Sequence, residues 1–263
     1  MPGLAEHQSS KFTKCLFIGD SKSGKTGALA SLAIEGYKLR ILDYDNGLDI
    51  LAKTLRDKKP EALKNVEYRT LRDKLVSTPV GTIVEGTPKA FSEGLKLLDN
   101  WKYGDTDLGK PATWGPDCIL VIDSLTFMAD AAFRFREPLT PKSRDGKYDK
   151  RAVYGDAQDA IADVLDQVTS DTFQSNVIVT SHIRYVDNPD GTKKGYPTAV
   201  GSALSPEIPR FFNTVALCQT QAGGKRTIVT AATAMIDLAN PANFSASLPI
   251  ETGMAAFFKS LRS

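Results

Sequence analysis

Short apolar runs alternate with amphipathic segments along most of the chain. Runs such as residues 118–122 are apolar throughout, as is typical of strands buried on both faces of a parallel sheet. Segments such as residues 155–168 instead place apolar residues three and four positions apart, which indicates helices. Strands that alternate with helices favour βαβ units. We therefore expect an α/β protein with a mostly parallel, twisted sheet flanked by helices.

The expected elements follow from these runs. The strands should comprise residues 12–18, 39–42, 118–122, 177–180, 215–218 and 227–230. The helices should comprise residues 26–34, 90–101 and 155–168, the first ending at Gly36. We expect a single domain over residues 1–263, with residues 1–10 as a flexible tail.

Two stretches depart from the alternation, residues 134–154 and 185–206. Both combine basic residues with prolines and glycines, which favour turns over regular structure. Because connections of this length are usually functional or disordered, we expect two mobile basic loops. Their cations are Arg134, Arg136, Lys142, Arg144, Lys147, Lys150 and Arg151 in the first and Lys193 and Lys194 in the second, which Arg184 directly precedes.

Composition changes this picture little. A formal net charge of +2 does not indicate a nucleic-acid or membrane partner, so any such binding must come from local patches. Cys15, Cys118 and Cys218 lie in apolar runs, and their number and spacing argue against disulfide bonds or a zinc site. Without a signal-peptide pattern or an apolar run of about 20 residues, we expect a soluble cytoplasmic protein without membrane contact.

The first candidate for chemistry is the glycine-rich segment 19–26, Gly-Asp-Ser-Lys-Ser-Gly-Lys-Thr, which follows a predicted strand and begins a predicted helix. Such a loop turns backbone N–H groups toward a phosphate, and the helix adds its positive end. Lys25 should reach the β- and γ-phosphates of ATP, and the Thr26 hydroxyl should hold Mg²⁺. We expect the Asp20 carboxylate to point outward. The predicted nucleotide-binding residues of this loop are Gly19, Asp20, Ser21, Lys22, Ser23, Gly24, Lys25, Thr26 and Gly27.

Asp123 is the second candidate, because it ends the apolar strand expected at residues 118–122. A carboxylate at the carboxyl edge of a parallel sheet, beside a phosphate loop, can hold Mg²⁺ or polarise a water bound to it. The alternative is that Asp123 caps the helix that follows it, although Ser124 suits that position better.

Two further groups follow predicted strands. Asp43, Asp45 and Asp49 cluster after the strand at residues 39–42, and since hydrolysis needs a group that activates water, we assign this role to Asp45. The alternative is an acidic turn with helix caps. His182 follows the strand at residues 177–180, where a polar side chain can contact the γ-phosphate and signal its loss to the next loop. Alternatively, this histidine only satisfies a backbone carbonyl.

The order of these blocks resembles the RecA superfamily of ATPases over about residues 12–229. The resemblance rests on the segment from Asp43 to Asp49, on Asp123-Ser124, on a strand with a polar end, and on a long loop before Gly201-Ser202-Ala203-Leu204. Within the superfamily, the sequence is most similar to the short phage RecA-like proteins linked to single-strand annealing, because of its bare core, its Thr-Ser-His motif and the segment 201–212.

The resemblance implies roles for individual residues. Asp45 matches the catalytic glutamate but is one methylene shorter, which implies either slow hydrolysis or assistance by a different group. His182 replaces the sensor glutamine. Asp49 falls where the family contacts adenine. The two basic stretches match the loops that contact DNA. Lys225 and Arg226 are the nearest counterparts of the cations that reach a neighbouring subunit's nucleotide.

The leading hypothesis is an ATPase that binds single-stranded DNA, forms filaments or rings, and acts in phage recombination or strand annealing in the host cytoplasm. A single-stranded-DNA-binding protein would be a further partner. Basic side chains would follow phosphates, while Tyr148, Tyr185 or Tyr196 would stack on bases. The alternatives are a nucleotide switch, a kinase-like protein or a motor accessory that never contacts DNA, with the basic stretches as solvated surface.

Overall fold

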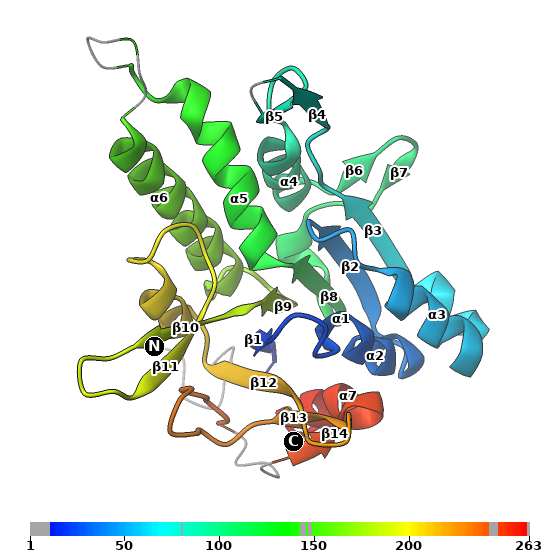
Figure 1. Ribbon diagram of the computed structural model, residues 1–263. Helices are drawn as coiled ribbons and strands as arrows, with labels where there is room; N and C mark the ends of the chain where they lie inside the picture. The colour runs from blue at the N-terminus through cyan, green and yellow to red at the C-terminus, as the bar shows by residue number, and fades with distance from the viewer. Residues whose placement is uncertain (1–10, 80, 143–145, 147–148, 242–246, 262–263) are drawn as a thin grey trace, which may run out of the picture.

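The computed structural model describes residues 11–79, 81–142, 146, 149–241 and 247–261. An eight-stranded sheet crosses the protein in the order β14-β13-β12-β1-β9-β8-β2-β3 (Figure 1). The strands from β12 to β3 are parallel, and β13 and β14 are antiparallel additions at one edge. The strands of the sheet are β1 (Lys14–Gly19), β2 (Lys38–Asp43), β3 (Val66–Thr70), β8 (Gly115–Asp123), β9 (Ser175–Ser181), β12 (Thr214–Thr220), β13 (Arg226–Val229) and β14 (Ser247–Pro249). The predicted α/β fold with a mostly parallel sheet is confirmed.

Helices cover both faces of this sheet (Figure 1). The α-helices are α1 (Lys25–Ala28), α2 (Ala30–Ile34), α3 (Asp49–Lys58), α4 (Ala90–Asp99), α5 (Leu125–Arg136), α6 (Lys150–Thr169) and α7 (Ile250–Ser260). Short 3₁₀ turns are η3 (Pro60–Asn65), η4 (Pro111–Thr113), η5 (Glu137–Leu139) and η6 (Ser205–Phe211). Three hairpins lie outside the sheet: β4 (Leu75–Thr78) with β5 (Gly81–Val84), β6 (Lys102–Tyr103) with β7 (Thr106–Asp107), and β10 (Ile183–Asp187) with β11 (Lys193–Pro197).

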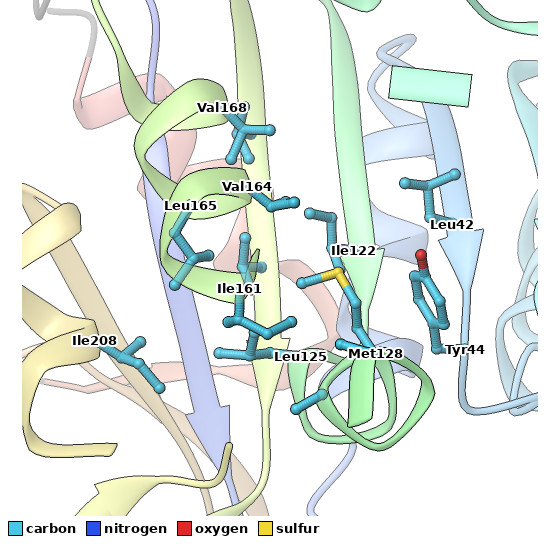
Figure 2. Close-up of a cluster of buried hydrophobic side chains, with 14 of the residues drawn as sticks. Leu42, Tyr44, Ile122, Leu125, Met128, Ile161, Val164, Leu165, Val168 and Ile208 are labelled. Carbon is cyan, nitrogen blue, oxygen red and sulfur yellow. The ribbon is translucent and has the colours of Figure 1, made fainter. Parts of the chain in front are cut away.

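Alternation along each central strand divides the core into two layers. In β8, Leu120 and Ile122 face the layer of α4, α5 and α6, while Ile119 and Val121 face the layer of α1, α2, α3 and α7. Figure 2 shows the first layer, where Ile122 lies near Met128 of α5 and Ile161 and Val164 of α6. Because both faces of these strands are buried, the apolar runs show no polar alternation.

The predicted strands and helices lie where the sequence placed them, with ends shifted by a few residues. The helix expected at residues 26–34 is divided at Leu29 into α1 and α2, and Gly36 follows it with a φ of 101°. Among the described helices, none combines the length and apolar character of a membrane span.

Residues 134–154 do not form one long loop, contrary to the prediction. Helix α5 continues through Arg134 to Arg136, and α6 begins at Lys150. The Asp149 side chain accepts a hydrogen bond from the backbone N–H of Arg151, which caps α6, and Val153 is fully buried. The cap and the buried Val153 explain why a helix extends into a strongly basic segment. The predicted loop residues Arg144, Lys147 and Tyr148, like the predicted tail at residues 1–10, lie outside the described residues.

Residues 185–206 are also more regular than predicted, because β10 and β11 pair as an antiparallel hairpin. The turn expected near Gly191 is present, with the Gly191 N–H donating to Asn188 O at 3.0 Å. Gly191 has a φ of 81°, a conformation that glycine adopts without strain. The basic residues of this segment therefore stand on a defined hairpin.

Candidate nucleotide-binding site

The phosphate loop connects β1 to α1 at the carboxyl edge of the sheet (Figure 1). Its turn closes through a hydrogen bond from Ser23 N to Asp20 O at 3.2 Å, and Gly24 has a φ of 104°. Gly19 has a different reason to be glycine, because a Cβ there would lie 2.5 Å from the backbone oxygen of Cys218 on β12. The two glycines therefore permit a tight turn against a neighbouring strand.

Lys25 is buried beneath this loop. Its ammonium donates hydrogen bonds to the carbonyl oxygens of Gly19 and Asp20, both at 2.9 Å. Burial lowers the pKa of Lys25, and the nearby carboxylates of Asp123 and Asp45 oppose this shift. An anionic phosphate in the loop would favour the charged form of the lysine in the same way.

Asp123 is buried at the end of β8, and two hydroxyl groups hold its carboxylate. Thr26 donates to Oδ2 at 2.7 Å, and Thr180 of β9 donates to Oδ1 at 2.5 Å. Burial raises the pKa of Asp123, while these hydrogen bonds oppose the shift. The carboxylate does not cap α5: Ser124 is the N-cap residue, and its own buried hydroxyl has no partner.

The oxygen atoms of Thr26 and Asp123 suit Mg²⁺, which prefers hard oxygen ligands. No described cation forms an ion pair with Asp123, so its ionised form would gain from a bound metal ion. The residues present therefore fit the ion that the sequence implied.

The three aspartates after β2 have different environments. Asp43 is buried and accepts hydrogen bonds from Thr70 Oγ1 at 3.0 Å and Asn46 N at 2.7 Å, so it stabilises the turn. Asp45 is half-buried and lines the cavity beside Lys25. Asp49 is exposed at the start of α3 and lines a separate cavity between α3 and β3, away from the phosphate loop. The structure thus places Asp45, and not Asp49, beside the loop.

His182 lies just after β9, and its half-buried ring meets the ring of Phe127 edge-on at 5.8 Å between centroids. Burial lowers the pKa of His182, and the charge of Lys25 lowers it further. Among the described residues, no carbonyl accepts a hydrogen bond from this ring, so the alternative that His182 only satisfies a backbone carbonyl finds no support. The imidazole faces the same cavity as Lys25 and Asp45.

Lys25, Asp45 and His182 meet in one cavity of about 480 Å³. It is lined by Lys25, Thr26, Asp45, Phe127, His182 and Arg226, together with the loop backbone and Ile50. A slightly larger cavity of about 510 Å³ lies along α3 and β3 but contains no phosphate-loop residue. We regard the smaller cavity as the nucleotide site, because the cations and the loop line it.

Comparison with known protein families matches residues 11–238 to the family described as AAA domain. The matched region includes the phosphate loop, Asp45, Asp123 and His182. The chain belongs to the AAA domain family. It is therefore a P-loop domain of the nucleotide-binding ATPase type. No curated protein matched the sequence.

Sequence reasoning missed three residues in or next to the site of this AAA domain. Phe127 and Ile50 line the cavity, but isolated apolar residues in helices do not stand out. Arg72 donates through Nη1 to the carbonyl oxygens of Tyr44 at 3.2 Å and Asp45 at 3.4 Å. Its guanidinium also lies 5.5 Å from the ring centre of Phe127. Arg72 follows the end of β3, and a polar residue at that position was the one clue available.

The predicted DNA-binding cations of the AAA domain do not form one surface. Arg134 and Arg136 lie at the end of α5, Lys150 and Arg151 at the start of α6, and Lys142 between them. The hairpin β10–β11 lies elsewhere, beside η6 and near the carboxyl edge of the sheet (Figure 1). Two hairpin cations are already paired, Lys193 with Asp187 at 3.5 Å and Lys194 with Asp237 at 2.7 Å. Arg184 is exposed and has no ion-pair partner among the described residues.

Proposed function

We propose that this AAA domain is a RecA-like ATPase that binds single-stranded DNA in response to ATP and acts in phage recombination or strand annealing. The observation that carries the proposal is a direct link between the nucleotide cavity and a basic hairpin. His182 lines the cavity, and β10 begins at the next residue. A change at the nucleotide can therefore reach the hairpin through a single peptide bond.

A second contact supports the same link. The Tyr185 hydroxyl of β10 lies near the carboxylate of Asp20 in the phosphate loop. Burial and this negative charge raise the pKa of Tyr185. Nucleotide phosphates would bring more negative charge beside Asp20. ATP binding would therefore repel the Asp20 carboxylate from its present position. The contact joins the hairpin to the part of the loop that responds to ligand.

At the nucleotide, each residue has a distinct task in the proposed reaction. Lys25 binds the β- and γ-phosphates, and the Asp45 carboxylate orients the attacking water. Mg²⁺, held through Thr26 and Asp123, would neutralise part of the phosphate charge. His182 detects the γ-phosphate. The Asp45 carboxylate accepts no hydrogen bond among the described residues, so it can accept one from water.

The hairpin offers the chemistry that single-stranded DNA requires. Arg184 pairs in register with Tyr196, and Val186 pairs with Lys194, so Arg184, Tyr196 and Lys194 share one face. Cations that contact phosphates next to an aromatic ring that stacks on bases are typical of sequence-tolerant binding. Assembly into a filament or ring, and a single-stranded-DNA-binding protein as partner, belong to the same proposal and rest on the RecA-like resemblance.

The test is ATP hydrolysis measured with and without single-stranded DNA, together with DNA binding at several salt concentrations. We expect DNA to stimulate hydrolysis and ATP to strengthen binding, with an affinity that falls as salt rises. The variant R184A/K194A should lose stimulation and retain basal hydrolysis. The matched control K38A/K53A removes two exposed cations elsewhere and should behave as wild type.

A nucleotide switch or motor accessory without DNA contact is the second candidate. The ion pairs of Lys193 and Lys194 favour it, because they reduce the positive charge that the hairpin offers to DNA. If single-stranded DNA did not change the rate of ATP hydrolysis and the protein showed no salt-sensitive DNA binding, the second candidate would be supported and the first contradicted.

A further inference from the structure

Arg226 lies beside the phosphate loop of its own chain because of the way β12 and β13 join the sheet. Strand β12 runs parallel to β1, with Cys218 opposite Gly19 at the start of the loop. The chain then turns through Gly223 and Gly224, whose φ angles are 84° and 80°, and returns as β13. This turn brings Arg226, the first residue of β13, back to the carboxyl edge of the sheet.

The side chain of Arg226 packs on the loop itself. Its Cδ atom would lie 3.0 Å from a Cβ placed on Gly24, and its Nε atom 3.7 Å. The side chain lines the same cavity as Lys25, Asp45 and His182. Because the aliphatic stem rests on Gly24, the guanidinium at its end is within reach of a phosphate held by the loop.

The guanidinium is also available for a ligand. Arg226 is exposed and forms no ion pair with any described residue, in contrast to Lys193 and Lys194. A guanidinium can donate two parallel hydrogen bonds to a phosphate, and in proteins it is effectively always charged. Arg226 therefore brings a second permanent cation to the cavity that already contains Lys25.

We propose that Arg226 binds the phosphate chain of the nucleotide in its own subunit, which rests on the ATP site of the proposed function. The sequence resemblance assigned Arg226 to a neighbouring subunit's nucleotide instead. The packing of the Arg226 side chain on Gly24 favours the nucleotide of the same subunit. Lys225 behaves differently: it lies in the turn, where its carbonyl accepts a hydrogen bond from Gln221 N at 2.7 Å, and it does not line the cavity.

The first experiment measures binding of a fluorescent ATP analogue, without DNA, to wild type, R226A, R226K and R210A. R226A should raise the Kd about tenfold or more, since a charge-assisted contact to phosphate is lost. The Kd of R226K should lie between those of R226A and wild type, because lysine retains the charge but lacks the paired N–H donors of the guanidinium. R210A removes an exposed arginine of η6 that pairs with Glu207, and its affinity should match wild type. Equal affinity of R226A and wild type, with both folded by circular dichroism, would overturn the proposal.

The second experiment decides whether Arg226 acts on its own subunit or on a neighbour. K25A lacks a working phosphate loop, and R226A lacks the arginine. If the arginine acted on a neighbour, a mixture of the two variants would regain ATPase activity, because K25A subunits would supply Arg226 to intact loops. We expect the mixture to show only the sum of the separate activities. Recovery beyond that sum would refute the assignment to the same subunit.

The two experiments separate this inference from the proposed function. If wild type neither hydrolyses ATP nor responds to DNA, the proposed function fails, and the binding titration still tests Arg226. If wild type hydrolyses ATP but R226A binds the analogue as tightly as wild type, only the role of Arg226 fails.

Discussion

The Thr180 hydroxyl donates a hydrogen bond to the buried carboxylate of Asp123, 2.5 Å away on the neighbouring strand. Thr180 thereby favours the ionised form of a group whose pKa burial has raised. Removing the hydroxyl in T180V should raise the pKa of Asp123 further. Because Mg²⁺ needs the ionised carboxylate, Mg²⁺-dependent ATP hydrolysis should fail at a higher pH than in wild type. A pH–rate profile measures this shift. The control T180S keeps the hydroxyl and should resemble wild type. If the acidic limb of the profile did not move in T180V, Thr180 would not have this role.

Lys25 gives the most direct test of the nucleotide site. K25A should abolish binding of ATP, because the loop loses the cation that meets the β- and γ-phosphates. Isothermal calorimetry measures the affinity. K53A is the matched control, since Lys53 forms an exposed ion pair with Asp57 on α3. Retained ATP binding in K25A would refute the assignment of the phosphate loop.

His182 should titrate below its usual pKa of 6.5, because burial and the charge of Lys25 disfavour the imidazolium form. The unfolded chain then binds the proton more readily than the folded protein. The neutral ring therefore contributes stability above about pH 6.5 that is lost as the pH falls through the lowered pKa. Bound ATP should raise this pKa by adding negative charge.

The measurement is an NMR titration of the histidine side chains with and without ATP. His7 is the other histidine of the chain, so H7Q leaves a single signal. A midpoint at or above 6.5 without nucleotide would show that the ring is not in the environment described.

Arg72 should act as a positioning residue for Asp45. It donates to the Asp45 carbonyl and lies over Phe127, which in turn contacts His182. R72A should lower kcat for ATP hydrolysis by about tenfold while KM changes little, because misplacement of a reacting group affects the chemical step. R72K should recover part of the loss. R69A is the control, since Arg69 lies over Tyr103 away from the cavity. If R72A and R69A lowered stability by the same amount and neither changed kcat, Arg72 would have only a structural role.

The parts of the fold that the sequence predicted share a physical cause. Strands such as β8 and β9 are buried on both faces of the sheet. Their central residues are therefore mostly apolar, whichever face each side chain points to. The phosphate loop was also predictable, because Gly24 meets a local backbone requirement, a positive φ, that few other residues satisfy. Local requirements leave a local signal.

The rest depends on contacts between distant segments. In the hairpin β10–β11, strand β10 is mostly exposed and β11 contains only one large apolar side chain, Tyr196, so no apolar pattern marks it. The basic start of α6 is held by its cap and by the burial of Val153. Arg226 reaches the cavity because β12 lies beside β1, and Arg72 reaches the Asp45 carbonyl because β3 lies beside β2 on the other side. Sheet order cannot be read from a local pattern, so neither placement could be predicted.

One consequence follows from the two hydrogen bonds between the Lys25 ammonium and the carbonyl oxygens of Gly19 and Asp20. A ligand does not meet an unsatisfied cation there and must replace partners that the backbone already provides. Phosphate oxygens carry enough negative charge to replace these carbonyl oxygens as hydrogen-bond partners of the ammonium. A nucleoside without phosphate has no group that can displace two carbonyl oxygens, so the loop by itself selects for phosphorylated ligands.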